Sequence, residues 1–566
     1  MTDSLNPAPS PDRSADRSTQ SPQAATASQA STAAQAPHAE SRAVSRDELS
    51  GAASALLAGT GSHDSYRLTL VACHDDGNEF RIVYVFSATA RVVELTVRIP
   101  KADAWIPSLA HHSLAAGNFE REMRDLFGVR PHNHPQPHRL VRHGHWPRGW
   151  YPMLAEPNPM PEFEPDVESF PFVEVEGPGV YEIAVGPIHA GVIEPGHFRF
   201  SVVGETIVRM EARQYYLHRG MEKLFQGRRP AAGIELAEQI SGDTAIGHSL
   251  AYLMAVEAAA GIEVSEPDLL VRALLLELER LYNHVTDLGS LANDTGFAIV
   301  DAHAQQLRET LLRINKSVTG HRLLRGALSL GGVLVRTLPD PAELRRIAGA
   351  LGEIVAITLG HAIVRDRFTG TAALPTTQAR TIGTVGYVAR ASGLDVDARR
   401  DHPFVDLGDA FDVVTETGGD VLSRYQVRAR EFQVSTSVII ALISRLDVAF
   451  PEARLGSGRI AELGPACAVR QTSTHTSTDA SAGASTATAA RAGTGIRSGL
   501  GLVEGWRGTI AHRVELAADG TLSRVKIVDP SFLNWPSLPI ALAVTIVPDF
   551  PLANKSFNQS YAGNDL

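Results

Sequence analysis

The stretch AEQISGDTAIGHSLAY, residues 237–252, decides how this chain is interpreted. It places the hydroxyls of Ser241 and Thr244 three residues apart, and the later stretch DPSFLNW repeats that spacing with Ser531 and Asn534. Cysteine thiolates at such a spacing bind soft transition metals. Neutral hydroxyl and amide groups do not deprotonate near neutral pH and hold these metals far more weakly, so the two pairs do not predict a metal centre.

Composition limits the classes of protein to which this chain can belong, but it does not identify a function. Its 566 residues are too many for one ordinary hydrophobic core, so at least two domains are expected. The formal net charge of -11 argues against a general nucleic-acid-binding surface. With Cys73 and Cys467 as its only cysteines, the chain cannot build a disulfide framework, a four-cysteine zinc site or an iron–sulfur cluster by itself. Any cluster must belong to a partner.

No apolar run in the sequence is long enough to predict a membrane span. The densest run, LLVRALLLELERL, is interrupted by Arg272, Glu277, Glu279 and Arg280. The first residues also lack the basic start and continuous apolar stretch of a secretory signal. Membrane association of this chain is therefore expected to be peripheral.

The sequence contains two low-complexity segments, one at its start and one within the second folded part. Residues 1–45 are mostly Ser, Ala, Pro, Gln and Thr and cannot bury enough apolar surface to fold, so they predict a disordered tail. Residues 472–499 have a similar composition and predict a surface insertion. The predicted domains are residues 46–165 and residues 171–566, the second of which contains the insertion.

The predicted fold class is α+β, with a small mixed domain ahead of a larger, mainly helical domain that contains β hairpins. In the small domain, the helical segment SRDELSGAASALLAG precedes the strands YRLTLVACH, FRIVYVFSA and VVELTVRIP. In the large domain, YEIAVGP and HFRFSVVGETIVRMEAR predict a hairpin. The clearest helix begins after Ser265, an N-cap residue followed by Pro267 and Asp268.

A long motif, NFEREMRDLFGV at residues 118–129, follows the strands of the small domain. It resembles the FERE-x-x-D-x-FG motif of the 30-kDa subunit of complex I, and the resemblance implies a docking domain without a cofactor. The histidines after it lie in a proline-rich loop without cysteines or paired acidic ligands, so a metal site is not predicted there. These histidines are His132, His134, His138, His143 and His145.

The segments GPIHAGVIEPGHFRF, residues 186–200, and LHRGMEKLFQGR, residues 217–228, resemble two branches of one family. One branch is the 49-kDa subunit of complex I. The other is the large subunit of formate-hydrogenlyase-type (group 4) energy-converting nickel–iron hydrogenases, to which the EPGHF version is closer. A 30-kDa-like domain can be fused ahead of the large domain in this family, so the resemblance covers nearly the whole chain apart from the tail and the insertion.

The hydrogenase branch implies where a nickel–iron centre would lie. Its segment ER-x-C-G-x-C-x-x-x-H-S-x-A-Y corresponds to residues 237–252, where this chain keeps Gly242 and His248, and its segment DPC-x-x-C corresponds to DPSFLNW. The former nickel-ligand positions are Ser241, Thr244, Ser531 and Asn534. The resemblance therefore implies the hydrogenase fold without a nickel–iron centre, because no thiolate remains at these positions.

The complex I branch implies a pocket for quinone or another acceptor, where a histidine and a tyrosine hydrogen-bond the quinone headgroup. His197 matches the histidine and Asp294 its acidic partner, whereas Gly242 stands at the tyrosine position. Quinone chemistry at this pocket would lack one proton donor. In a purely structural interpretation, His197 bonds backbone groups of a hairpin turn and Asp294 caps a helix end.

The segment EGWRGTIAH matches an EG-x-RG element of the family and is expected to line the same cavity as His248. Its polar residues are Glu504, Arg507 and His512. Along the helix after Ser265, Glu277, Arg280 and His284 fall near one side. A proton relay is one interpretation of these three residues, and the mutual pairing of buried charges is the simpler one.

The family resemblance implies a subunit of a membrane-associated respiratory-type or hydrogenase-related oxidoreductase complex. Its role there would be to link electron transfer, with quinone as one acceptor, to ion translocation by its partners. The implied partners are an iron–sulfur small subunit and antiporter-like membrane subunits, and the implied location is peripheral, on the cytoplasmic side of the inner or plasma membrane. No cofactor other than quinone is expected on this chain. No G-x-G-x-x-G loop follows a strand, so any NAD link is expected on another subunit.

Three functional hypotheses stay open at this point. In the first, the chain reduces quinone or another acceptor at His197 and Asp294. In the second, it is a non-catalytic subunit that couples conformational changes and keeps the cavity as an inheritance of the fold. In the third, which the missing cysteines disfavour, it is an active hydrogenase with unusual ligands or an NADH–quinone oxidoreductase subunit.

Overall fold

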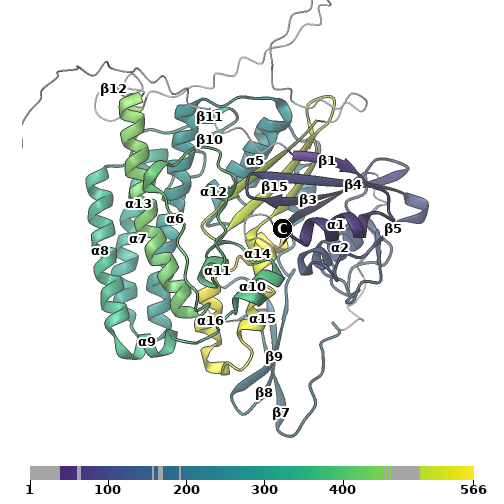
Figure 1. Ribbon diagram of the computed structural model, residues 1–566, viewed down its shortest axis with the longest axis horizontal. Coiled ribbons are helices and arrows are strands. Elements are labelled where there is room, and N and C mark those ends of the chain that lie inside the picture. The colour runs from purple at the N-terminus through teal and green to yellow at the C-terminus, as the bar shows by residue number, and fades with distance from the viewer. Residues whose placement is uncertain are drawn as a thin grey trace, which may run out of the picture. The chain divides into compact units, whose positions relative to one another are not determined.

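A computed structural model describes residues 39–59, 65–155, 159–163, 170–189, 193–449, 454–455, 459–460 and 497–566. All of these residues lie in one compact unit, Ala34–Leu566. The predicted tail is outside the described residues up to residue 38, and the predicted insertion is outside them up to residue 496. The fold class is α+β, as predicted, with a strand-rich N-terminal part and a larger helical part (Figure 1).

The N-terminal part is built on a four-stranded sheet with the order β1-β4-β3-β2. Its strands are β1 (Ala39–Ala43), β2 (Arg67–Asp75), β3 (Glu79–Ala88) and β4 (Arg91–Pro100). Helices α1 (Leu49–Leu57) and α2 (Leu114–Phe127) pack against the sheet. The three predicted strands and the predicted first helix are confirmed, since branched and aromatic side chains of the strands form a buried core with these helices.

The predicted tail ends too late in the sequence. Residues 39–43, which their composition assigns to the tail, form β1, which pairs in parallel with β4 from Ala39 opposite Val92 to Ala43 opposite Thr96. Most of β1 is exposed, so it contributes hydrogen bonds of the backbone and little apolar burial. Composition cannot predict such a strand, because pairing at a sheet edge places little demand on the side chains.

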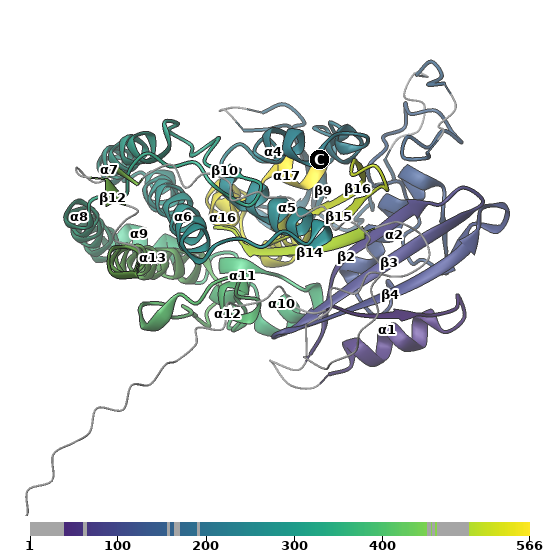
Figure 2. The same ribbon diagram turned by 90° about the horizontal axis from the view of Figure 1, so that it is seen from above.

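Five long helices dominate the C-terminal part: α5 (Ala245–Ala260), α6 (Glu266–Asp294), α7 (Ala298–Thr319), α8 (Pro341–Gly360) and α13 (Val421–Ala449). The start predicted for α6 is confirmed, because the Ser265 hydroxyl accepts a hydrogen bond from the Asp268 N–H. Figures 1 and 2 show α6, α7, α8 and α13 side by side, and contacts between α6 and α7, α6 and α13, and α8 and α13 agree with this arrangement.

Two three-stranded antiparallel sheets belong to the C-terminal part. The predicted hairpin is confirmed as β7 (Val180–Val185), β8 (His197–Val203) and β9 (Thr206–Arg213). The second sheet contains β14 (Arg497–Glu504), β15 (Thr509–Leu516) and β16 (Leu522–Val528). Residues 497–499 therefore belong to a strand and not to the predicted insertion. The predicted end of the insertion is too late, because Ser and Gly in this strand resemble the composition of the segment before it.

The helix α5 lies directly on the backbone of β14. A Cβ atom at Gly501 would meet the Ala251 carbonyl oxygen at 2.0 Å, and one at Gly499 would meet the Ala255 carbonyl oxygen at 2.1 Å. Only glycine permits this approach. The contact fixes the middle of α5 relative to the second sheet, and the loop that carries Ser241 and Thr244 leads into this helix.

Shorter elements connect these parts. The strands are β5 (Trp105–Pro107), β6 (Arg130–His132), β10 (Leu328–Ser329), β11 (Gly332–Val333), β12 (Arg454–Leu455) and β13 (Arg459–Ile460). The α-helices are α3 (Met221–Phe225), α4 (Pro230–Ala237), α9 (Ala362–Phe368), α10 (Thr376–Ile382), α11 (Gly386–Ala391), α12 (Ala398–Asp401), α14 (Pro530–Asn534), α15 (Ser537–Ala541), α16 (Phe550–Phe557) and α17 (Tyr561–Asp565). The 3-10 helices are η1 (Lys101–Asp103), η2 (Gly408–Ala410) and η4 (Val547–Asp549).

Helix α13 corrects the expectation that no segment has the length and composition of a membrane span. Its most apolar window has a mean hydropathy of 1.4, and α8 with α9 passes the same test as a pair bent by 83°. The sequence prediction misses α13 because Arg424, Arg428 and Glu431 interrupt its first half. The apolar window is 44% buried within the molecule, and its side chains join the hydrophobic core. A core helix has the same composition, so α13 does not by itself indicate a membrane span.

Buried ion pairs join the N-terminal sheet to the second C-terminal sheet. The Arg81 guanidinium donates to both carboxylate oxygens of Glu515, at 2.8 and 2.9 Å. Arg513 pairs with Glu94 at 3.0 Å and with Glu515 at 2.7 Å. Because all four side chains are largely shielded from water, each charge depends on its partners for solvation. The two sheets are therefore held together by paired charges as well as by a shared core.

We expect Glu515→Ala to lower the free energy of unfolding by about 3–5 kcal/mol, because it leaves Arg81 and Arg513 buried without their shared carboxylate. Denaturant unfolding followed by far-ultraviolet circular dichroism measures this change. The matched control is Glu343→Ala, which removes a carboxylate from a partly exposed pair with Arg346. If the two variants lose the same stability, the Glu515 cluster does not hold the sheets together.

Candidate functional site

Two segments that are distant in sequence meet at the former nickel-ligand positions. The first is the loop 238–244 between α4 and α5, which holds Ser241 and Thr244. The second is α14, which holds Ser531 and Asn534 and follows β16. Ser560 lies between them: its hydroxyl contacts the Ser241 hydroxyl at 2.9 Å, and its backbone N–H donates to the Ser531 hydroxyl at 2.9 Å.

The other two positions are also engaged in hydrogen bonds. Thr244 donates its hydroxyl to Asp243 at 2.9 Å and accepts from the Trp506 indole at 3.1 Å. The Asn534 amide forms two hydrogen bonds with the backbone of Val385, at 2.9 and 3.1 Å. All four side chains are buried, and each has a partner from the protein itself.

A bidentate ion pair links the loop to the second sheet. Arg507, in the turn between β14 and β15, donates to both oxygens of Asp243 at 2.6 and 2.7 Å. Its guanidinium also stacks on Trp506, with the central carbon 4.0 Å from the ring centroid. Desolvation raises the pKa of Asp243, but the Arg507 charge and hydrogen bonds from Arg507, Thr244 and Ser241 outweigh it and lower that pKa below its ordinary value. Asp243 therefore carries its charge at neutral pH.

The residues at the four positions do not fit a nickel–iron centre. Their donors are three hydroxyls and an amide, which are poor ligands for nickel, and all four are already hydrogen-bonded. Cys73 is buried in β2, and Cys467 lies outside the described residues. Within the part of the chain that the structure describes, no three His, Cys, Asp or Glu side chains are grouped to hold a metal ion.

His248 belongs to a buried polar chain that crosses three elements. One ring nitrogen lies 2.9 Å from a carboxylate oxygen of Asp529, and the other lies 3.1 Å from a ring nitrogen of His512. The other Asp529 oxygen accepts from the Ser531 N–H and so caps α14. Burial and the neighbouring His248 lower the pKa of His512 well below its ordinary value, which keeps that ring neutral.

Glu504 lies at the end of β14 and belongs to a different group of charges. Its carboxylate accepts from Arg390 at 2.7 Å, from the Thr509 hydroxyl at 2.9 Å and from the Ala398 N–H at 3.1 Å. None of the hydrogen bonds or ion pairs found among the described residues joins Glu504 to the loop 238–244. Of the predicted cavity residues, the structure thus brings Arg507 to the loop directly, and His248 to α14 through Asp529.

The structure places His197 and Asp294 in separate hydrogen-bond environments. His197 begins β8, lies 3.3 Å from the Gly186 carbonyl through one ring nitrogen, and has a second, buried ring nitrogen without a partner among the described residues. Asp294 ends α6 and pairs with Lys555 of α16 at 2.7 Å. No hydrogen bond joins the two residues in the described structure. Gly242 is exposed, and a Cβ atom there would meet nothing within 4 Å.

The acidic residues of the motif in α2 bind loops of the N-terminal part and a strand of the C-terminal part. Glu122 pairs with Lys526 of β16 at 2.6 Å. Asp125 accepts from three consecutive backbone N–H groups, those of residues 140–142, and Glu120 accepts from the Leu109 N–H. In the histidine-rich loop, His134 contacts the Gly117 carbonyl and His132 stacks on Trp105. The motif therefore holds the loops of the N-terminal part and reaches the C-terminal part.

Of the three residues predicted on one side of α6, Glu277 and Arg280 form a buried ion pair with each other, and His284 bonds to a residue of another helix. Glu277 accepts from Arg280 at 3.1 Å, and His284 lies 2.8 Å from Glu431 of α13. Burial lowers the pKa of His284 to about 4, although Glu431 favours its charged form. At neutral pH this histidine is uncharged.

Sequence reasoning missed Asp243, Ser560 and Asp529 as members of the site. Asp243 was within reach of that reasoning, because an acidic residue between Ser241 and Thr244 is the natural partner for Arg507. Ser560 was not, because its place depends on how the last helices fold back.

Comparison with known families agrees with this geometry. Residues 294–565 match the family described as the 49-kDa subunit of respiratory-chain NADH dehydrogenase, and residues 43–159 match the family described as its 30-kDa subunit. Among solved structures, a chain of the membrane-bound sulfane sulfur reductase, an archaeal respiratory membrane complex, is similar with a TM-score of 0.56 and 22% identity. That similarity covers 69% of this chain and 99% of the other and shows a shared fold.

Curated relatives align with 60% or more of this chain. Formate hydrogenlyase subunit 5 of Escherichia coli is 30% identical, over 86% of this chain and 82% of the relative. Hydrogenase-4 component G of the same organism is 30% identical, over 81% and 75%. The C/D subunit of NADH-quinone oxidoreductase from Phocaeicola vulgatus is 29% identical, over 60% and 70%. This chain belongs to the family that unites the 49-kDa subunit of complex I with the large subunits of formate-hydrogenlyase-type hydrogenases, and it carries a 30-kDa-type domain in the same polypeptide.

Proposed function

We propose that this chain is the large subunit of a membrane-associated oxidoreductase complex and takes part in electron transfer without a nickel–iron centre of its own. The observation that carries the proposal is the candidate site, where the loop 238–244 and α14 are closed by hydrogen bonds and by the Arg507–Asp243 ion pair. A site closed in this way retains the family fold but lacks the ligands for hydrogen chemistry.

The partners in this proposal follow from the relatives. Formate hydrogenlyase subunit 5 and the C/D subunit of NADH-quinone oxidoreductase are named as subunits of larger enzymes. An iron–sulfur small subunit would supply the electrons, since this chain has only two cysteines and cannot hold a cluster itself. Antiporter-like membrane subunits would translocate ions, and the chain would lie peripherally on the cytoplasmic side of the membrane.

We assign the acceptor to a pocket beside His197. One ring nitrogen of His197, which has no partner in the part of the chain that the structure describes, is buried in the wall of a cavity of about 730 Å³, and the Phe172 ring lies 5.4 Å from the histidine ring. When this nitrogen carries a proton, it can donate a hydrogen bond to a carbonyl oxygen of a bound quinone. Asp294, paired with Lys555, would act at a distance and not on the headgroup.

A second candidate function is non-catalytic coupling between partner subunits. The observation in its favour is that the four former ligand positions are saturated by internal hydrogen bonds, so that the loop needs no ligand to be ordered. In this case the site would transmit movements of the loop to α14 and α5 through the chain of Asp529, His248 and His512.

We expect the purified complex to contain nickel at far below one atom per chain, because hydroxyl and amide oxygens bind it too weakly. Inductively coupled plasma mass spectrometry measures the metal content. The control is the same chain with all four positions changed: Ser241→Cys, Thr244→Cys, Ser531→Cys and Asn534→Cys. This variant is expected to retain more nickel, since thiolates restore soft ligands. Nickel at one atom per wild-type chain would contradict the proposal and support an active hydrogenase.

We expect His197→Ala to slow reduction of a short-chain quinone by about 100-fold in the purified complex, because it removes the group that hydrogen-bonds the headgroup. The complex is reduced with dithionite, and its reoxidation by the quinone is followed by stopped-flow absorbance. The matched control, His303→Ala, removes an exposed histidine of α7. Equal rates in the two variants would favour the non-catalytic function.

Gly242→Tyr tests whether a quinone binds beside the loop 238–244. The open space at Gly242 accepts a tyrosine, so stability should stay within about 0.5 kcal/mol of the wild type. If quinone binds beside this loop, the added donor should raise quinone reduction at least about tenfold. Gly352→Tyr, at another open and exposed position, is the control. An unchanged rate with unchanged stability would mean that quinone does not approach Gly242.

A further inference from the structure

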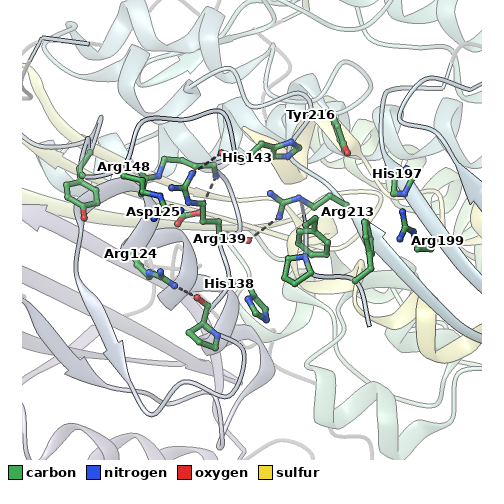
Figure 3. Close-up of a pocket in the computed structure, with 18 residues that line it drawn as sticks. Arg124, Asp125, His138, Arg139, His143, Arg148, His197, Arg199, Arg213 and Tyr216 are labelled. Carbon is green, nitrogen blue, oxygen red and sulfur yellow. Dashed lines mark hydrogen bonds between the residues drawn. The ribbon is translucent and has the colours of Figure 1, made fainter. Parts of the chain in front are cut away.

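The cavity beside His197 has a strongly positive lining that quinone binding does not explain. Figure 3 shows it between loops of the N-terminal part and the hairpin β8–β9, with Arg139 and Arg213 near its centre. The charged residues that line it are six arginines, Arg124, Arg139, Arg142, Arg148, Arg199 and Arg213, and one carboxylate, Asp125. A neutral headgroup would leave most of this positive charge unbalanced.

The arginines at the centre of the cavity bond to carbonyl groups and not to carboxylates. Arg139 donates to the carbonyls of His143 and Trp146, at 3.0 and 3.1 Å. Arg213 donates to the carbonyls of Arg139 and Leu140, at 3.1 and 3.0 Å. Carbonyl oxygens orient a guanidinium but bring no formal negative charge. Neither arginine forms an ion pair with a described residue, so each keeps its net charge.

Arg142 adds a buried donor to the same wall. It is 5% exposed, it donates to the Trp150 carbonyl at 2.5 Å, and its Nε–H has no partner among the described residues. Burial lowers the pKa of Arg142, and the charge of Arg139 lowers it further, while Asp125 acts in the opposite direction. An unpaired donor in a buried cation is costly unless an anion binds to it.

Asp125 does not balance this charge. One of its oxygens accepts three backbone N–H groups, those of Leu140, Val141 and Arg142, at 2.8 to 3.2 Å. Glu182 pairs with Arg199 at 3.6 Å, and among the described residues that line the pocket the guanidinium groups still outnumber the carboxylate.

The guanidinium groups of two arginines lie over aromatic rings at the sides of the cavity. The Arg213 guanidinium lies 4.6 Å from the centroid of Phe170, and that of Arg199 lies 4.2 Å from the centroid of Phe172. Stacking on a ring immobilises the planar guanidinium and leaves its edge available for bidentate hydrogen bonds. The side chains are thus ordered before a ligand arrives, which lowers the entropic cost of binding.

We propose that this pocket binds a ligand that carries a phosphate monoester or diphosphate group. A carboxylate offers one charge and two oxygens, whereas a phosphate monoester offers about −1.5 to −2 charges and three oxygens, which suits several converging guanidinium groups better. The volume of about 730 Å³ leaves room for an organic group beside Phe170 and Phe172. The phosphate belongs either to a soluble compound or to a phospholipid headgroup.

Inorganic pyrophosphate is the first probe, and isothermal titration calorimetry on the full-length chain is the measurement. We expect one pyrophosphate per chain, with an affinity that falls as salt rises. Arg213→Gln should weaken binding about tenfold or more. Arg213 also holds the loop at Leu140, so Arg199→Gln serves as a second variant at the partly exposed rim and should weaken binding in the same direction. The matched control, Arg346→Gln, removes an exposed arginine of α8 and should bind as the wild type does.

Vesicles of phosphatidylcholine with phosphatidic acid distinguish the two sources. Vesicle binding that pyrophosphate displaces and Arg199→Gln weakens would identify a lipid headgroup. Pyrophosphate binding without vesicle binding would identify a soluble phosphate. The proposal is overturned if pyrophosphate does not bind the wild type, or if all three variants bind it equally. It is also overturned if polyglutamate, a carboxylate ligand, occupies the pocket and pyrophosphate does not displace it. Because no electrons are transferred, this test is independent of the proposed role in acceptor reduction.

Discussion

The bidentate ion pair between Arg507 and Asp243 is the interaction on which the centre of the molecule depends. It joins the turn between β14 and β15 to the loop ahead of α5. In relatives with a nickel–iron centre, the family pattern implies that thiolate–metal bonds would connect this loop to the segment after β16. Here hydrogen bonds through Ser560 make that connection, and Arg507 brings a permanent positive charge to the loop. In this chain, an ion pair and hydrogen bonds thus hold these segments together.

Close packing of one backbone on another also stabilises the centre of the molecule. Helix α5 lies on β14 because Gly499 and Gly501 have no side chains, and Asp529 holds α14 and His248 together. These contacts hold the loop 238–244 in place before any partner or ligand binds. The positions of His248 and Ser531 therefore follow from the packing of the surrounding elements, which the sequence motif alone does not describe.

Much of the fold could be predicted from the sequence, because alternating apolar residues and the Ser265 cap are local signals. The strand β1 could not, since its pairing with β4 depends on the backbone and its side chains are mostly exposed. At the site, the motif register led to Ser241, Thr244, Ser531 and Asn534, of which the fold links Ser241 to Ser531 through Ser560. Ser560 and the arginine-lined cavity escaped prediction because they depend on contacts between residues distant in the sequence, as between Arg213 and Leu140.

The ion pairs that join the N-terminal part to β15 and β16 also suggest why the two parts share one polypeptide. If the chain were divided between them, Glu122 and Glu94 would face water on one fragment, and Lys526 and Arg513 on the other. Each fragment would present a charged face complementary to the other and would expose core residues, such as Phe119 on the first and Phe532 on the second. A gene split at this point would yield two chains that require each other from synthesis onward, so the covalent fusion supplies a fixed stoichiometry and a high local concentration.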